Sequence, residues 1–152
     1  MKNFLEEYVK RGLIKEEQIG FDQVAKHLDR AKKDLHVAKA NLKIDTEASY
    51  NYAYLAMLRS GRALMFSFKL RPIDGEQHKT VVAFCENILG KEYPQSVKFF
   101  NRMRKKRNRF TYDEAGLIVS ETETGQAFKK AKEFVGQIHE YIQNKNPQKK
   151  LI

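Results

Sequence analysis

The residues best suited to chemistry lie between Lys98 and Tyr112, where the chain reads KFFNRMRKKRNRFTY. Seven of these residues are basic and none is acidic. Guanidinium groups bind phosphate oxygens in a planar fork, so clustered arginines favour phosphate as the ligand. The phenylalanines and the methionine of the segment are not typical of a disordered basic tail. We therefore predict a phosphate-binding site that is displayed on folded structure.

Wound as a helix at about 100° per residue, this segment has two faces. The apolar side chains fall on the side that faces a core: Phe99, Met103 and Phe110. Basic side chains fall on the solvent side, where they can contact a polyanion: Arg102, Lys105 and Arg109. We expect these three cations to contribute to phosphate or RNA binding.

Arg107 falls at the margin of the apolar face, between Phe100 and Met103, with Arg104 beside it. A buried arginine is costly unless it is paired. One explanation is a carboxylate partner within the fold, or an aliphatic stem that covers the core while the guanidinium reaches water. The other is that Phe100 marks a protein interface and that Arg104 and Arg107 line the resulting cleft. The spacing is compatible with both explanations.

Asn108 and Tyr112 are four residues apart, so on a helix they share a face and can both hydrogen-bond to a ribose or a phosphate. Arg107 and Tyr112 do not share a face of a regular helix. They can meet only if the helix ends near Thr111, or across a symmetric dimer.

The elements that position these residues are predicted to be helices. Four long segments have apolar residues at spacings of three and four, and none shows sustained alternation. The long helices are expected to begin near Asp22, Asp45, Pro94 and Ser120, and a shorter one over residues 81–88 ends at Gly90. Short connections between them favour an all-α fold, an antiparallel up-and-down four-helix bundle with additional short helices.

The segment from Asp45 to Leu70 is apolar nearly all round, so we expect it to be the most buried helix and to end at Arg71-Pro72. Gly61 lowers helix propensity within it, which a close approach of a neighbouring element would offset. Two arginines near this glycine face a cleft or pair with carboxylates, and pairing is the favoured interpretation: Arg59 and Arg62.

Three parts are expected along the chain: a short N-terminal helical extension (1–20), the helical bundle (21–144) and a flexible C-terminal tail (145–152). The net charge of +10 favours polyanionic partners. No apolar run approaches the roughly 18 residues that span a bilayer, and the N-terminus lacks the apolar core of a secretory signal. We therefore expect a cytoplasmic protein without membrane contact, where the single cysteine, Cys85, stays reduced.

The run RMRKKRNRFTYDEAG is preceded by YLAMLRSGRALMFSFKLRP and HKTVVAF and followed by SETETGQAFKKAKEFV. In this order and spacing the patches resemble the HEPN superfamily (higher eukaryotes and prokaryotes nucleotide-binding), over roughly residues 20–142. The resemblance implies a four-helix core, usually dimerised so that two copies of the conserved helix face each other across a cleft. Many members are metal-independent ribonucleases, including toxins of toxin-antitoxin pairs, and others partner a minimal nucleotidyltransferase.

In active members of that superfamily the motif is an arginine, often followed by a polar residue, with a histidine four to six residues after the arginine. Arg107 and Asn108 match the first two positions, whereas Tyr112 stands where the histidine is expected. Histidine, with a pKa near 6.5, can accept a proton at neutral pH, but tyrosine, near 10, is a poor base. We expect a catalytic set of Arg107, Asn108 and Tyr112 in which cleavage is weakened or altered.

The histidines do not stand in a metal-binding arrangement, so we predict neither a metal nor another cofactor. His78 could replace the missing histidine from another helix, although a capping or surface role is the favoured interpretation. Cys85 is interpreted as a buried hydrophobic residue.

Three functions are compatible with these residues. The first is a homodimer that binds RNA or a nucleotide at Arg107, with Arg104, Asn108 and Tyr112 assisting, and whose enzymatic form is an endoribonuclease of toxin-antitoxin type. The second is a non-catalytic module that binds a nucleotidyltransferase-type antitoxin or another protein through a structural Arg107. Sequence-specific DNA binding ranks last, because no helix-turn-helix is recognisable.

Overall fold

The computed structural model describes residues 1–73, 77–112 and 119–151, with side chains for all of these except 110–112. The described residues are mostly helical, which confirms the predicted all-α fold. The helices are α1 (Lys2–Lys10), α2 (Phe21–Ala40), α3 (Thr46–Ser67), α4 (Gln77–Leu89), α5 (Pro94–Tyr112) and α6 (Glu121–Lys145). Two short strands accompany them: β1 (Ile14–Glu16) and β2 (Leu70–Pro72).

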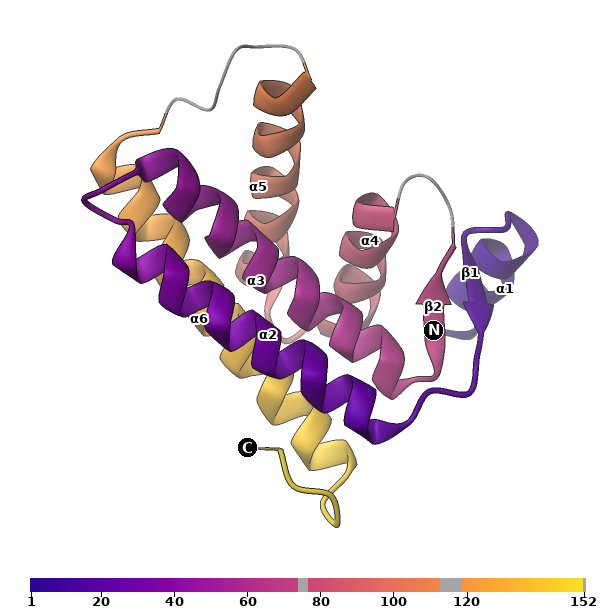
Figure 1. Cartoon of the computed structure of the whole chain (residues 1–152). Coiled ribbons are helices and arrows are strands. Elements are labelled where there is room, and N and C mark those ends of the chain that lie inside the picture. Colours follow the sequence, from indigo (N-terminus) through magenta and orange to yellow (C-terminus); the bar gives the residue numbers. More distant parts are fainter. Residues whose placement is uncertain (74–76, 113–118, 152) are drawn as a thin grey trace.

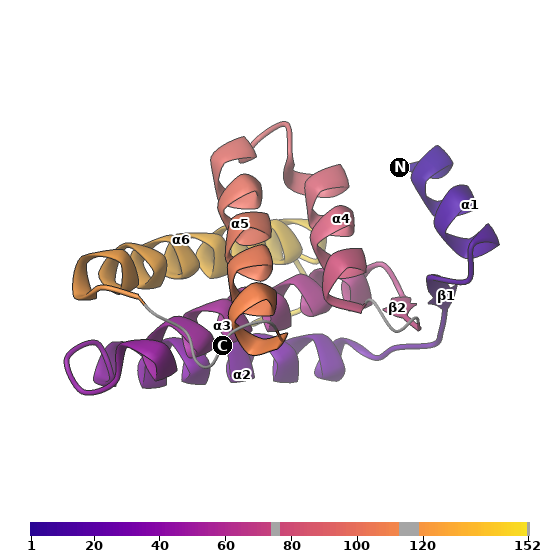
Figure 2. The same ribbon diagram turned by 90° about the horizontal axis from the view of Figure 1, so that it is seen from above.

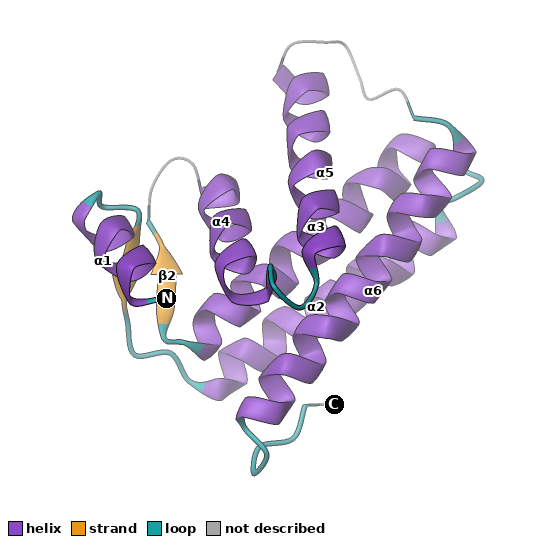
Figure 3. Cartoon of the chain, turned by 180° about the vertical axis from the view of Figure 1, so that it is seen from behind, coloured by secondary structure: helices purple, strands orange, loops and turns teal. Residues whose placement is uncertain are grey.

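Helix α3 is the centre of the arrangement. It packs against α2 and α6, which run beside it along its length, and against α4 and α5 (Figure 1). Seen from above, α4 and α5 form an antiparallel pair that crosses the three long helices (Figure 2). Figure 3 shows the same arrangement from behind, with α1 and the two strands at the far end from the α2–α3 turn. The prediction that α3 is the most buried helix is confirmed, since buried residues lie on most sides of this helix.

The starts of the long helices follow local chemistry. The Asp45 carboxylate accepts a hydrogen bond from the Ala48 amide at 3.0 Å and caps α3, and the Ser120 hydroxyl caps α6 in the same way. Helix α2 begins near Asp22 as expected, but the capping role that the sequence suggests for Asp22 is wrong, because the N-cap is Gly20 and Asp22 lies in the first turn. There the carboxylate still interacts favourably with the positive end of the helix. The sequence also predicts a break after α5 at Gly116, and this position lies outside the described residues.

The end of α3 differs from the prediction. The helix ends at Ser67 rather than at the Arg71-Pro72 pair, because Lys69 adopts a left-handed backbone conformation with φ of 59°. The released segment forms β2, which pairs antiparallel with β1 so that Ile14 faces Pro72. This pairing is too short to give an alternating sequence pattern, so periodicity could not predict it. It joins the N-terminal residues to the bundle.

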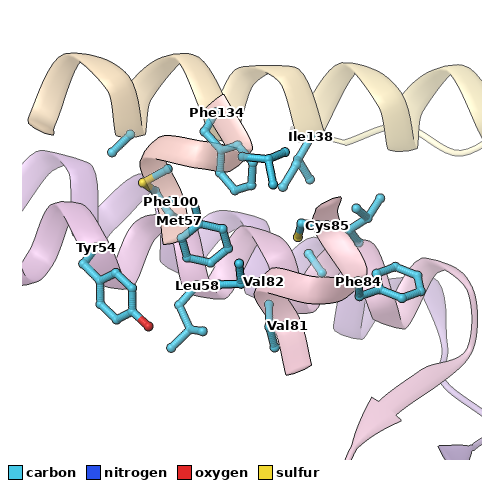
Figure 4. Packing of buried hydrophobic residues seen from close by; sticks show 14 of the residues in the cluster. Tyr54, Met57, Leu58, Val81, Val82, Phe84, Cys85, Phe100, Phe134 and Ile138 are labelled. Atoms are coloured by element: carbon cyan, nitrogen blue, oxygen red, sulfur yellow. The ribbon is translucent and has the colours of Figure 1, made fainter. Parts of the chain in front are cut away.

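The core is continuous from α2 to α6 and includes Phe84 of α4 and Phe100 of α5 (Figure 4). The Phe100 ring is fully buried, with its centroid 5.1 Å from that of Phe134 and 6.0 Å from that of Tyr54. The expectation that Phe100 marks a protein interface is therefore wrong, because the chain's own helices cover the ring. Cys85 is fully buried and burial raises the pKa of its thiol, as expected of a small core residue.

At Gly61, α3 packs closely against side chains of α4. A Cβ atom there would lie 2.6 Å from Val81 Cγ1 and 3.1 Å from Cys85 Sγ, so the predicted close approach is confirmed, with side chains of α4 as the neighbours.

We expect Gly61→Ala to lower the free energy of unfolding by about 1–2 kcal/mol, because overpacking outweighs the gain in helix propensity. The matched control is Gly136→Ala in α6, where a Cβ meets nothing within 4 Å and stability should rise by about 0.5–1 kcal/mol. Urea unfolding measures both, and equal effects of the two variants would contradict the packing argument.

The two ends of the chain contact the bundle. Phe4, Leu5 and Tyr8 of α1 pack against the core, whereas Val9 is 49% exposed. At the other end the Gln143 side chain accepts a hydrogen bond from the Leu151 amide at 2.9 Å. In the described part of the chain, no helix is both long enough and apolar enough to cross a membrane.

Candidate phosphate-binding site

Arg107 forms a cluster with two residues from other helices, Tyr54 of α3 and His78 of α4. The guanidinium carbon of Arg107 lies 5.3 Å from the centroid of the Tyr54 ring, within the range of a cation–π contact. The Tyr54 hydroxyl lies 2.9 Å from His78 Nδ1. The tyrosine therefore contacts the guanidinium through its ring and the imidazole through its hydroxyl.

The fold brings these three residues together through the crossing of α4 and α5 over α3. Tyr54 is buried on α3 at the end of the aromatic cluster, as Figure 4 shows. His78 is the second residue of α4 and is half-buried, and Arg107 is half-buried near the C-terminal end of α5. Because each residue comes from a different helix, no local spacing in the sequence links them.

Among the described residues, Arg107 has no carboxylate partner, which was one of the explanations for its position. The ion pairs of the described residues do not include Arg107, and its Nε atom is buried without a hydrogen-bond partner. In contrast, Arg59 confirms the pairing interpretation, since it donates a hydrogen bond to buried Asp34. The guanidinium of Arg107 thus rests on an aromatic face with part of its hydrogen-bonding capacity unused.

Two further arginines lie near this cluster, and neither is neutralised by a carboxylate in the described residues. Arg104 donates two hydrogen bonds to the Asn101 amide oxygen, and Arg62 donates one to the Gln77 amide oxygen at 3.1 Å. Both arginines influence the titration of Tyr54 and His78 through their charge. We call the set Tyr54, Arg62, His78, Arg104 and Arg107 the arginine–tyrosine–histidine cluster.

Burial and positive charge set the protonation of this cluster. Burial, followed by the charges of Arg107, Arg62 and Arg104, lowers the pKa of His78 to about 4. The position at the start of α4 acts in the same direction, since the N-terminal end of a helix disfavours a cation. Burial raises the pKa of Tyr54 to about 12, although the arginines oppose the shift. At neutral pH the imidazole is neutral and the phenol keeps its proton.

This balance predicts an acid-sensitive contribution to stability. The pKa of His78 lies below its ordinary value of 6.5 in the folded state, so the unfolded chain binds the proton more readily between about pH 6.5 and pH 4. The stability that the neutral His78 side chain contributes is therefore complete above pH 6.5 and is lost as the pH falls toward 4. We expect the wild-type protein to lose more stability than His78→Gln between pH 7 and pH 4.5 in urea unfolding. The opposite order would contradict a neutral, buried imidazole.

Beside Arg62 the surface is hollowed into a pocket of about 320 Å³. It is lined by His27, Arg62, Phe66, Arg71, Pro72, Ile73 and Gln77. Arg71 lies over the Phe66 ring at 4.9 Å, and the His27 ring meets the same phenylalanine edge-on. The pocket adjoins the cluster because Arg62 belongs to both.

The remaining predicted site residues of α5 point in several directions. Arg102 lies over the Phe99 ring at 4.9 Å and borders a separate pocket with Lys98, Gln126 and Lys130. Lys105 and Arg109 are exposed, as predicted for the solvent side, and Asn108 is half-buried. Tyr112 is the last residue of α5, and its side chain lies outside the described part.

Sequence reasoning found Arg107 and Arg104 but did not assign Tyr54 to the site. In the sequence, Tyr54 is not distinguished from the other apolar residues of a buried helix. The one indication of a special role is that a buried tyrosine hydroxyl needs a hydrogen-bond partner. For His78 the sequence favours a capping or surface role, whereas in the structure its Nδ1 atom has the hydroxyl of the buried Tyr54 as partner. Within the described residues, no group of three or more His, Cys, Asp or Glu side chains is arranged to hold a metal ion.

Comparison with protein families gives one result for the chain as a whole. The family model described as HEPN domain matches residues 24–142, from α2 into α6. The matched range includes Tyr54, His78 and Arg107. A search of curated proteins gave no match.

Proposed function

Since the chain belongs to the HEPN domain family, we propose that it binds RNA or a nucleotide through a phosphate group held by Arg107. HEPN membership supports a function related to nucleotides or RNA. The observation that carries the assignment to this site is the state of Arg107, whose guanidinium is half-buried over Tyr54 and has no carboxylate partner among the described residues. A phosphate supplies the charge and the acceptor oxygens that this guanidinium lacks.

The neighbouring charges suit the same ligand. Arg104 and Arg62 are held by amide oxygens rather than by carboxylates, so their positive charge is not cancelled at the cluster. The aromatic ring under Arg107 restricts its orientation, which lowers the entropy lost when the guanidinium binds a phosphate. Asn108, the next residue on α5, is placed to assist through its amide, and Tyr112 is assigned the same assisting role.

We also propose that the protein acts as a homodimer in which two copies of α5 face each other across a basic cleft. HEPN domains are often dimeric, and the positive charges of Arg104 and Arg107 on two facing copies of α5 would repel each other unless an anion lay between them. Phe100 cannot supply the contact, because it is buried within its own chain. Two exposed cations of α5, Lys105 and Arg109, then form the rim of the cleft.

The enzymatic form of this proposal is a metal-independent endoribonuclease of toxin-antitoxin type, with a nucleotidyltransferase-type protein as its partner. In such a reaction the ribose 2′-hydroxyl loses its proton and attacks the adjacent phosphate, the bond to the 5′-oxygen of the next nucleotide breaks, and that oxygen leaves with a proton from the solvent. Arg107 stabilises the charge that develops on the phosphate oxygens. The reaction also needs a group that accepts a proton. Tyr112 is poorly suited to that task, so cleavage is expected to be slow.

The test compares two charge-removing variants on opposite parts of α5. Arg107→Ala is expected to weaken binding of a fluorescein-labelled single-stranded RNA pool by about 10- to 100-fold, as loss of a charge-assisted hydrogen bond implies. Arg102→Ala removes the same charge but lies over Phe99, away from the cluster, so we expect at most about a threefold loss. Fluorescence anisotropy at fixed salt measures both. Full affinity in Arg107→Ala, or equal losses in both variants, would overturn the site assignment.

A further inference from the structure

The further inference concerns His78, and it rests on the proposed function of the Arg107 site. We infer that His78 is a ligand-contacting residue whose Nε2–H donates a hydrogen bond to the phosphate held by Arg107. Tyr54 is the positioning residue that sets the tautomer of His78. The histidine missing after Arg107 in the sequence is thus replaced from α4 by a hydrogen-bond donor and not by a base.

The tautomer follows from the hydrogen bond between the two side chains. The Tyr54 hydroxyl is buried and keeps its proton, and a buried O–H donor needs an acceptor. The imidazole Nδ1 lies 2.9 Å from this hydroxyl and is the acceptor that the described residues provide. A neutral imidazole that accepts at Nδ1 carries its proton on Nε2.

The Nε2 atom is available to a ligand. In the described residues, the buried side-chain polar atoms without a hydrogen-bond partner are Asp34 Oδ1, Arg107 Nε and Gln137 Oε1. His78 Nε2 is not among them although no described residue hydrogen-bonds to it, so the atom is not completely buried. The site therefore offers a phosphate two donors whose geometry Tyr54 sets, the guanidinium above its ring and the imidazole at its hydroxyl.

The surrounding charges fix what the imidazole can do. The charged and titratable groups that influence it are Tyr54 and Arg62 from α3 and Arg104 and Arg107 from α5. Three cations oppose protonation of the ring, so it cannot act as an acid at neutral pH. Its Nδ1 lone pair is engaged by the Tyr54 hydroxyl, so it cannot act as a base without breaking that bond. A neutral N–H donor is the remaining role.

The arrangement also couples ligand binding to proton uptake. A phosphate at the cluster offsets the repulsion from Arg62, Arg104 and Arg107, so the pKa of His78 rises when the ligand binds. Affinity is therefore expected to increase as the pH falls from 7 toward 5. This increase in affinity at low pH should be absent in His78→Gln, which has no imidazole to protonate.

The experiment combines binding by variants with nitrogen NMR of the histidines, using the labelled RNA pool as the ligand. His78→Ala is expected to weaken binding about tenfold, whereas His78→Gln, whose amide N–H can occupy the place of Nε2–H, should retain most of the affinity. In the free wild-type protein, the His78 resonances should show the Nε2–H tautomer, and Tyr54→Phe should shift them toward a mixture of tautomers. RNA should move the His78 resonances and raise the pKa of this histidine.

The possible results separate the two proposals. If Arg107→Ala loses binding while His78→Ala binds as the wild type does, or if His78 carries its proton on Nδ1, the inference is overturned and the proposed function stands. Full RNA affinity in Arg107→Ala overturns both. If the RNA is cleaved in EDTA, and this cleavage disappears in His78→Ala but persists in the control Arg11→Ala, then His78 acts as an acid or a base, and its assignment as a donor only is overturned. Urea unfolding of each variant verifies that a loss of binding is not a loss of folding.

Discussion

Phe100→Ala is expected to lower the free energy of unfolding by about 4 kcal/mol, as is typical when a fully buried phenylalanine is truncated. The ring is in contact with Tyr54 and Phe134, so its removal leaves a cavity between α3, α5 and α6. Urea unfolding monitored by circular dichroism measures the change. Val9→Ala, at a 49% exposed position, is the control and should change stability by less than about 0.5 kcal/mol.

The same variant separates a core residue from an interface residue. If Phe100 stabilises the core of each chain, the loss of stability does not depend on protein concentration. If the ring instead contacts a second copy, its removal weakens dimerisation, and the effect becomes smaller at high protein concentration. A change confined to the dimerisation constant measured by ultracentrifugation would contradict the buried position of Phe100.

Arg59→Ala is expected to lower the free energy of unfolding by about 3 kcal/mol at pH 7, because it leaves Asp34 as a buried charge without its main partner. The Asp34 side chain is fully buried, and Arg59 of α3 donates a hydrogen bond to its Oδ2 atom. Arg30 lies 3.4 Å from the other carboxylate oxygen but is 53% exposed, so it compensates weakly. The pair connects α2 to α3, and urea unfolding measures its loss.

The pH dependence of this effect has a definite sign. Burial raises the pKa of Asp34, although Arg59 and Arg30 oppose the shift, and loss of Arg59 raises the pKa further. A carboxyl whose folded pKa lies above its unfolded value binds a proton more readily in the folded state, so the variant regains stability as the pH falls through the raised pKa. The deficit of Arg59→Ala should therefore be smaller at pH 5 than at pH 7.

Two controls test the cause. The double variant Asp34→Leu/Arg59→Met replaces the pair by apolar groups and should recover most of the stability, since it leaves no buried charge. Arg11→Ala removes an exposed partner of Glu7 and should cost less than about 0.5 kcal/mol. If the double variant is as unstable as Arg59→Ala, the loss comes from packing and not from an uncompensated charge.

Local patterns predicted much of the secondary structure. The capping residues Asp45 and Ser120 and the first-turn Pro94 begin helices where expected, because each acts on backbone groups within a few residues. The predicted end of α3 at the Arg71-Pro72 pair is wrong, since the left-handed backbone conformation of Lys69 ends the helix before that pair. The strands were missed because three residues are too few for a period to appear.

The sequence by itself determined the helical class, the basic character of α5 and the marginal position of Arg107, because these follow from residue types and from spacings along one helix. Only the tertiary structure decided what lies beside Arg107. The crossing of α4 and α5 over α3 places Tyr54 under its guanidinium and His78 at the tyrosine hydroxyl, and it buries Phe100 inside the chain. Contacts between helices depend on how their faces pack. The spacing of apolar residues along one helix does not determine which residues of the neighbouring helices will contact it.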